Sequence, residues 1–268
     1  MNMTSQGRFS GKVALVTGAA GGQGAVHVKR FLQEGADVVA LDVAGMPEQP
    51  TVTDVAAGRL LECRADVRKL ADLDRAVGAA TEAFGGIDVV VANAGINGSR
   101  GPAVEFEEEE WLRVLDINLN GVWRTVKATA PSLLASEKSP SVIIIGSTCA
   151  VKGYATSGHY TAAKHGLTGL LKVLSAELAP QGVRVNMINP TTVDTPLIQV
   201  QSMYDAFVPA GQEPTAENFR QAMFGLHQMP IPWIDPEDVT AAVVWLASEE
   251  SRYVTGAQIS VDGGAVLL

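Results

Sequence analysis

The chain has 268 residues, enough to bury a sizeable core in one domain without disulfide or metal staples. Its content of 47% hydrophobic and 18% charged residues excludes a disordered or fibrous protein. Lys and Arg number 20 against 29 Asp and Glu, and the net charge of −9 argues against nucleic acid and anionic membranes as main partners.

Short β-rich runs alternate with longer helical patterns along the chain. The runs predict strands over residues 12–17, 37–42, 60–65, 87–92, 141–146, 183–188 and 256–261. Helical spacing of apolar residues predicts a helix that ends near residue 34 and further helices over 68–84, 107–134, 159–179 and 235–248. Continuous Val and Ile runs are typical of strands buried on both faces. The pattern predicts one domain over 1–268, a doubly wound parallel α/β sheet of the Rossmann type.

Two stretches interrupt this alternation. Residues 43–58 hold two prolines and two glycines, so we expect a loop there, with at most a short helix near Thr53. Residues 196–233 hold five prolines and several aromatic side chains. A long apolar excursion before a terminal helix is more often a binding lid than a linker, so we expect a substrate lid at 196–233.

The two cysteines, Cys63 and Cys149, lie in apolar stretches and are predicted to be buried free thiols, which fits a reducing compartment. The first ten residues have no apolar core, so we expect no secretory signal. The longest uncharged run, 13–28, is shorter than the ~20 apolar residues of a membrane span. A cytoplasmic protein is the default expectation.

A glycine-rich turn follows the first strand. Gly18, Gly22 and Gly24 let the backbone approach a pyrophosphate closely, and the helix that follows offers free N–H groups to the phosphates. Asp42 ends the second strand, where an acid accepts hydrogen bonds from a ribose 2′-OH and repels a 2′-phosphate. The arrangement favours NAD over NADP. The alternative is a glycine-rich turn of some other α/β protein.

Tyr160 and Lys164 stand four residues apart, so they share a helix face. A phenol with a pKa of about 10 is a poor base at neutral pH, but a nearby ammonium together with an oxidised nicotinamide would lower that pKa. Ser147 follows the strand at 141–146, at the edge where open α/β sheets bind ligands. Each of these features also has an interpretation without a function. Tyr160 and Lys164 could be an exposed pair on a helix surface, and Ser147 could simply end a strand.

Several histidines and acids are interpreted as structural. His27 lies inside the first helix and is expected to be packed, whereas His159 either packs or borders a pocket. The acidic run 107–110 opens a helix, where negative charge suits the helix dipole. His, Cys, Asp and Glu show no metal-ligand spacing, so no metal is expected.

The same residues occur in order with Asp66-Val67, Asn93-Ala94-Gly95, Asn118 and Asn189-Pro190. Over nearly the whole chain this set resembles the short-chain dehydrogenase/reductase family. The four-residue step from Tyr160 to Lys164 resembles its single-domain alcohol/ketone branch, because the enoyl reductases of the same fold use a longer step.

The resemblance implies a role for each matching position. Tyr160 would be the general acid/base, Ser147 would position the substrate oxygen, and Asn118 would anchor a proton-relay water to Lys164. Lys164 would also hold the nicotinamide ribose. The implied cofactor-binding residues are Gly18, Gly22, Gln23, Gly24, Asp42, Asp66, Val67, Asn93, Tyr160, Lys164, Pro190, Val193 and Thr195. Gln23 stands where most members have an apolar residue.

The stretches PTTVDTPLIQ, MYDAFVP, MPIPWIDPEDV and RYVTG resemble the carveol-dehydrogenase-like, mycofactocin-coupled subgroup. This resemblance implies hydride transfer between NAD and a hydrophobic secondary alcohol, for example a terpenoid, or its ketone. It also implies retained NAD with mycofactocin as a redox-cofactor acceptor. The resemblance to the wider family implies a homotetramer built through the helices at 107–134 and 159–179. The insertion usual after the second strand of that subgroup is absent. The alternative is a non-catalytic NAD sensor or scaffold of the same fold.

Overall fold

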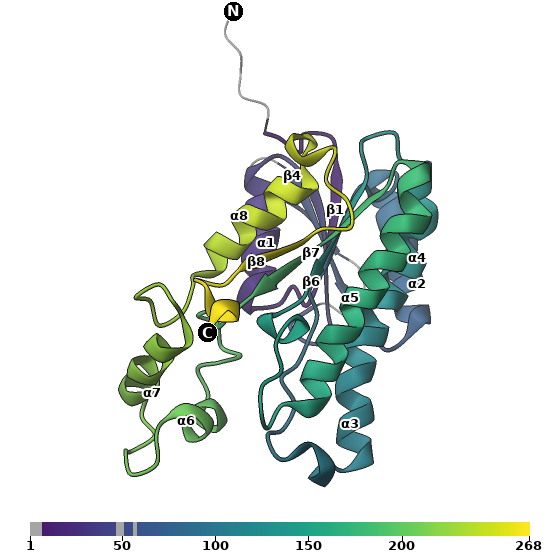
Figure 1. The fold of residues 1–268 in the computed structure, drawn as a ribbon. Helices are drawn as coiled ribbons and strands as arrows, with labels where there is room; N and C mark the ends of the chain where they lie inside the picture. The colour runs from purple at the N-terminus through teal and green to yellow at the C-terminus, as the bar shows by residue number, and fades with distance from the viewer. Residues whose placement is uncertain (1–6, 47–50, 56–57) are drawn as a thin grey trace, which may run out of the picture.

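A twisted sheet forms the middle layer of the molecule (Figure 1). The computed structural model describes residues 7–46, 51–55 and 58–268. Within these residues the sheet has eight strands in the order β3-β4-β2-β1-β5-β6-β7-β8. Their bounds are β1 Val13–Thr17, β2 Asp37–Asp42, β3 Thr51–Val55, β4 Gly58–Arg64, β5 Val89–Ala92, β6 Ser141–Ile145, β7 Arg184–Pro190 and β8 Gln258–Val261. All neighbouring pairs except β3–β4 run parallel, which confirms the predicted Rossmann-type sheet.

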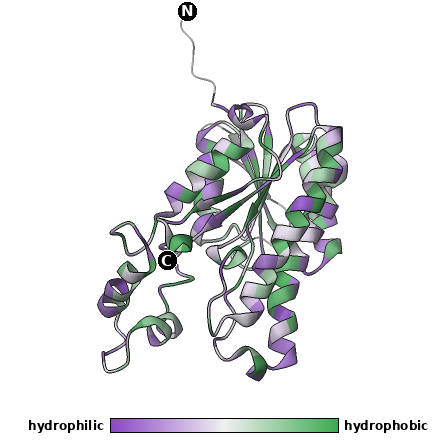
Figure 2. Ribbon diagram, in the orientation of Figure 1, coloured by the Kyte–Doolittle hydropathy of each residue, from purple (hydrophilic) through white to green (hydrophobic). Residues whose placement is uncertain are grey.

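Helices cover both faces of the sheet, and the central strands are apolar along their length (Figure 2). On one face lie α1 (Gly22–Gln33) and α8 (Pro236–Ala247), which share a core cluster with Phe31 and Val243. The other face carries α2 (Leu70–Phe84), α4 (Gly121–Ala135) and α5 (Gly158–Leu178). The strands are therefore buried on both sides, as their unbroken Val and Ile runs predict.

The helix predicted over 107–134 is divided in the structure. It consists of α3 (Glu108–Leu115), a π-helical turn (Asp116–Asn120) and α4, joined end to end. The Gly121 N–H bonds back five residues to the Asp116 carbonyl. Because the chain stays helical, the apolar spacing does not reveal the wider turn. A Cβ at Gly121 would lie 2.8 Å from Val67 Cγ2, so a larger residue would be crowded there.

The expected short helix near Thr53 is wrong. That residue lies in β3, which pairs antiparallel with β4 at the edge of the sheet. The run Thr51–Val55 is rich in β-branched residues, which favour an extended chain, and β4 offers it a free edge. The loop predicted over 43–58 is thus wrong at 51–55, whereas residues 43–46 form bends outside any helix or strand and Gly58 already begins β4. Residues 47–50 and 56–57 of that prediction lie outside the described residues.

The segment 196–233 forms a separate small layer (Figure 1). It holds α6 (Gln201–Phe207) and α7 (Ala216–Met223), which pack on each other through their own apolar cluster of Ile198, Met203, Phe219 and Met223. In the part of the chain that the structure describes, no helix is both long and apolar enough to cross a membrane.

Candidate active site

The glycine turn between β1 and α1 is as tight as its sequence predicts. Gly18 and Gly22 have φ values of +67° and +53°, which favour glycine. A Cβ at Gly24 would overlap the Gly18 carbonyl, so α1 can begin this close to β1 only with glycine there. Gly24 therefore acts in packing and does not line the cavity. Asn93, at the end of β5, donates from Nδ2 to the Thr17 and Gly18 carbonyls at 2.9 and 3.2 Å.

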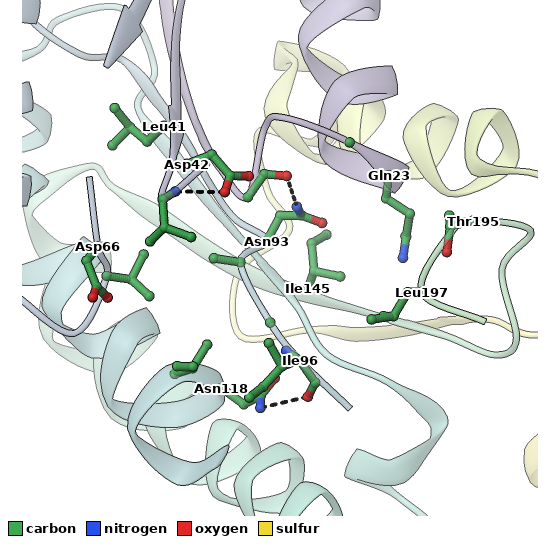
Figure 3. Close-up of a pocket in the computed structure, with 18 of the residues that line it drawn as sticks. Gln23, Leu41, Asp42, Asp66, Asn93, Ile96, Asn118, Ile145, Thr195 and Leu197 are labelled. Atoms are coloured by element: carbon green, nitrogen blue, oxygen red, sulfur yellow. Dashed lines mark hydrogen bonds between the residues drawn. The ribbon is translucent and has the colours of Figure 1, made fainter. Parts of the chain in front are cut away.

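Asp42 connects the end of β2 to this turn (Figure 3). Its Oδ2 accepts a 3.0 Å hydrogen bond from the Ala20 N–H, and its Oδ1 accepts one of 2.7 Å from the Val43 N–H. The carboxylate thus shapes the turn while facing the cavity beside it. Oδ1 also accepts a 3.3 Å hydrogen bond from the Ala44 N–H, so Oδ2 is the oxygen with a further lone pair for a ribose hydroxyl.

A cavity of about 570 Å³ lies along the carboxyl ends of β1, β2, β4 and β5. Most of the predicted cofactor residues line it: Gly18, Gly22, Gln23, Asp42, Asp66, Val67, Asn93, Tyr160, Lys164 and Thr195, with Asn118 beside them. Sequence reasoning missed other lining residues, chiefly Leu41, Arg68, Ile96, Ile117, Ile145 and Leu197. The sequence contains one hint of their role. Most of them lie within two residues of a predicted strand end or of a residue that was predicted to bind the cofactor.

Arg68 is paired with Asp66. Its Nε and Nη2 donate to both Asp66 carboxylate oxygens at 2.7 to 3.0 Å. This pairing lowers the pKa of Asp66, chiefly through the hydrogen bonds. The acid expected beside an adenine is therefore already neutralised by a neighbouring cation.

Asn118 sits in the π-helical turn and is fully buried. Its Nδ2 donates to the carbonyls of Ile96 and Val114 at 3.0 and 2.9 Å, and its Oδ1 accepts from the Ile96 N–H at 3.2 Å (Figure 3). Both amide hydrogens are used, so the side chain fixes the loop that follows β5 and has no donor left for a relay water.

Ser147 follows β6 and is held by the neighbouring strand. Its N–H donates to Asn189 Oδ1 at 3.3 Å, and its hydroxyl accepts from the Cys149 N–H at 3.1 Å. A Cβ at Gly146 would overlap the Asn189 amide oxygen, so this approach of β7 requires glycine. Asn189 is thus a positioning residue for Ser147.

Tyr160 and Lys164 lie on one face of α5, as their spacing predicts. The Lys164 Nζ is 5.5 Å from the Tyr160 ring centroid, and burial lowers the pKa of Lys164 to about 8. Burial also raises the pKa of Tyr160, and the nearby Ser147 hydroxyl opposes that rise. In this arrangement the phenol is neutral at physiological pH, so it can donate a proton.

A second cavity of about 140 Å³ opens beside the first. Five residues line both: Gln23, Gly146, Tyr160, Thr195 and Leu197. Ser147 lines only the smaller cavity, and so do Pro190 and Val193, which were predicted to bind the cofactor. The Tyr160 phenol therefore stands where the two cavities meet.

Gln23 is the polar side chain at this junction. It points from the start of α1 toward Thr195 and Leu197 (Figure 3), and its buried Oε1 has no hydrogen-bond partner. A buried amide oxygen without a partner is costly unless a ligand supplies a donor. The glycine turn, Asp42 and this oxygen all line the larger cavity. They fit a dinucleotide that extends from the glycine turn to the place where the two cavities meet and has a polar group there.

The remaining predictions have plain outcomes. Cys63 and Cys149 are buried and unpaired, as expected. His27 and His159 are both fully buried, and His159 stacks on Phe106 instead of lining either cavity. Among the described residues, no three His, Cys, Asp or Glu side chains are grouped so that they could hold a metal ion.

A largely parallel sheet with a glycine-rich turn after its first strand, and a Tyr–Lys pair at the mouth of a second cavity, are typical of a dinucleotide-dependent oxidoreductase. The comparisons with known proteins agree. The profile of the family described as enoyl-(acyl carrier protein) reductase, a group of short-chain dehydrogenases/reductases, matches residues 18–266. The chain belongs to the short-chain dehydrogenase/reductase family.

Its similarity to individual members extends over whole chains. It is 42% identical to (-)-trans-carveol dehydrogenase of Rhodococcus erythropolis, over 97% of this chain and 99% of that one. It is 38% identical to 3-alpha-(or 20-beta)-hydroxysteroid dehydrogenase of Mycobacterium tuberculosis, over 97% and 91% of the two chains. The crystal structure of carveol dehydrogenase from Mycobacterium avium in complex with NAD has a TM-score of 0.91 and 37% identity, and the match covers 98% of this chain and 100% of that one.

Proposed function

We propose that this enzyme interconverts a small hydrophobic secondary alcohol and its ketone, with NAD as the cofactor and Tyr160 as the general acid/base. The observation that carries the proposal is the position of Tyr160, between a cavity with a phosphate-binding turn and a smaller cavity that contains Ser147. A group that moves a proton during hydride transfer has to touch both partners of the reaction.

The larger cavity suits NAD. The glycine turn and the first N–H groups of α1 would hold the pyrophosphate, and Asp42 would accept a ribose hydroxyl and repel a 2′-phosphate. Lys164 would hold the nicotinamide ribose, and Asn93, Val67, Asp66 and Thr195 would complete the walls. When bound, NAD supplies the hydride acceptor or donor.

The chain's own groups would orient the substrate and move its proton. The Ser147 hydroxyl would hold the substrate oxygen, because Asn189 and the Cys149 N–H fix its position. In ketone reduction the neutral Tyr160 would give its proton to that oxygen. In alcohol oxidation Tyr160 must first be deprotonated, which the positive charges of Lys164 and an oxidised nicotinamide would favour. Asn118 would act through the backbone, since its side chain is already bonded.

The segment 196–233 would be the lid. Leu197, Ile198, Met203, Phe207 and Leu226 from this segment line the smaller cavity, and their apolar side chains favour a hydrophobic substrate. A terpenoid alcohol is consistent with this wall, since the relative from Rhodococcus erythropolis is named a carveol dehydrogenase.

Further parts of the proposal rest on the subgroup resemblance. They are retention of NAD through turnover and the passage of electrons to mycofactocin. A homotetramer rests on likeness to the family as a whole, and a cytoplasmic location rests on the composition of the chain. Exposed apolar side chains on the two long helices, Trp123 and Leu134 on α4 and Val173 on α5, support an interface there. Light scattering of the purified protein tests the oligomer, and a monomer would contradict it.

The test of the activity is a hydride-transfer assay on cyclic secondary alcohols, with and without an artificial electron acceptor. We expect NADH formation on the protein, and turnover that depends on the acceptor if NAD is retained. Steady NADH accumulation from added NAD would make this an ordinary exchanging dehydrogenase. Bound NAD without oxidation of any alcohol in the panel would favour the non-catalytic sensor.

A further inference from the structure

The smaller cavity contains a single charged side chain among the described residues that line it, Arg100. The other side chains that line the cavity are uncharged, some apolar and some polar. Arg100 is partly buried, and this burial lowers the pKa of its guanidinium. A charge that is partly withdrawn from water is costly unless it is paired, so a cation in this place is unexpected for a site that binds only neutral alcohols. The chain as a whole carries a net charge of −9, so Arg100 is not part of a generally basic surface.

The contacts of Arg100 within the structure are weak. Its Nη1 lies 3.5 Å from the Thr156 hydroxyl and its Nη2 lies 3.8 Å from the Met203 sulfur. The first distance is at the limit of a hydrogen bond and the second acceptor is a poor one. No carboxylate among the described residues approaches the guanidinium or acts on its charge.

The guanidinium is nevertheless held in place. Its Cζ lies 4.5 Å from the centroid of the Phe207 ring on α6, a cation–π contact. Its charge also acts on the Tyr160 phenol across the cavity, where it opposes the rise in the pKa of that group. Arg100 therefore lines the same cavity as Tyr160, is oriented by the Phe207 ring, and carries N–H donors that no strong acceptor among the described residues uses.

We propose that Arg100 binds a carboxylate of the substrate, so that the substrate class is a small hydrophobic hydroxy acid or oxo acid. An arginine fork matches a carboxylate in two parallel hydrogen bonds. The carboxylate would lie at Arg100 and the carbon that exchanges hydride would lie at Ser147 and Tyr160. This inference rests on the proposed function for the identity of the reacting end, and it adds the recognition of the other end.

Binding is measured first, without turnover. Calorimetry on the full-length, NAD-loaded protein compares cyclohexanecarboxylate with its methyl ester, which has the same ring and no charge. We expect the acid to bind about tenfold to a hundredfold more tightly than the ester. Arg100→Met should lose this preference and Arg100→Lys should keep part of it. Lys152→Met is the matched control, because Lys152 contacts Tyr154 and does not line the cavity. That variant should keep the preference.

Turnover is measured next with 3-hydroxycyclohexanecarboxylate, its methyl ester and cyclohexanol. We expect the acid to have the highest kcat/KM, and Arg100→Met to reduce the acid-to-ester ratio mainly through KM. The melting temperature of each variant shows whether loss of the contact between residue 100 and Phe207 has reduced the stability of the protein. If the native protein binds acid and ester equally, or Arg100→Met keeps the preference, Arg100 only anchors α6 and the inference is wrong. Selective binding of the acid without oxidation of any alcohol would instead sustain Arg100 as an anion site and contradict the proposed function.

Discussion

Lys164 donates a 2.8 Å hydrogen bond from Nζ to the carbonyl of Ile145, the last residue of β6. This bond joins the helix that carries Tyr160 to the strand that leads into Ser147. The three residues are thus fixed relative to one another by a buried contact that does not involve the Tyr160 hydroxyl. The ammonium group of Lys164 stays beside the Tyr160 ring. Burial is the largest cause of the raised pKa of Tyr160, and the Ser147 hydroxyl and the charge of Arg100 oppose the rise.

Removing the Tyr160 hydroxyl tests the proposed chemistry. Tyr160→Phe should lower turnover by at least ~10²-fold, the usual contribution of a positioned acid/base group, while the melting temperature and NAD binding change little. Tyr154→Phe is the matched control, because Tyr154 also lines the smaller cavity and, among the described residues, its hydroxyl bonds to Thr148. A Tyr160→Phe enzyme that kept more than about a tenth of the activity would rule out the assigned role.

Asp42 should set the choice of cofactor. Asp42→Asn keeps an oxygen for the Ala20 or Val43 N–H but loses the charge that repels a 2′-phosphate. The preference for NAD over NADP should fall by about 1.5–3 kcal/mol, the contribution of a charged hydrogen bond. Fluorescence titration with both cofactors measures it. Equal affinity of the native protein for NAD and NADP would contradict this prediction.

Gln23 should contribute to cofactor retention. Its Oε1 is buried without a partner, so a donor from bound NAD would relieve that cost. Gln23→Leu should raise the NAD dissociation rate about tenfold, a loss of ~1.4 kcal/mol. Stopped-flow displacement by an NAD analogue measures the rate, and the NAD content after purification gives a second reading. An unchanged rate would show that the amide does not bind the cofactor.

The segment 196–233 should become ordered when the site fills. Its helices α6 and α7 pack mainly on each other. Arg100 and Asn97 contact α6 through the Met203 sulfur, and Arg100 also lies over the Phe207 ring. Such a segment is suited to opening and closing. Hydrogen exchange should slow across α6 and α7 when substrate and NAD are added. Exchange that stayed the same would mean that the segment is a fixed part of the structure.

His27 should make the protein sensitive to acid. Its Nδ1 lies 2.7 Å from Thr240 Oγ1, and that hydroxyl donates to the Pro236 carbonyl, so His27 must donate from Nδ1. Its Nε2 is buried without a partner, and burial lowers the pKa of His27 to about 3.

The folded state therefore resists protonation of His27 while the unfolded state accepts it near pH 6.5. Neutral, buried His27 therefore contributes to the free energy of unfolding above pH 6.5. As the pH falls from 6.5 toward 3, this contribution decreases by about 1.4 kcal/mol for each pH unit. Denaturant unfolding of the native protein and of His27→Gln at several pH values measures this. We expect the difference between their unfolding free energies to shrink as the pH falls, and a difference independent of pH would contradict the argument.

Much of the site could be predicted because its key spacings are local. The turn from Gly18 to Gly24 and the step from Tyr160 to Lys164 each lie within one turn or one helix, so the backbone alone sets their geometry. The strand runs likewise predicted which end of the sheet would hold Ser147 and Asn93, since parallel strands end at a common edge. The π-helical turn around Asn118 was missed, because a helix that widens by one residue keeps its apolar stripe.

The sequence by itself determined the family, the Rossmann-type sheet, and the positions of the glycine turn and of the Tyr–Lys pair. Only the tertiary structure decided that Tyr160 stands between two cavities and that Asn189 fixes Ser147. It also decided that Arg68 neutralises Asp66 and that Arg100 faces the smaller cavity without an acidic partner. The physical reason is that most of these contacts join residues from different strands, loops and helices. Their distances depend on how the layers pack, which no local spacing records.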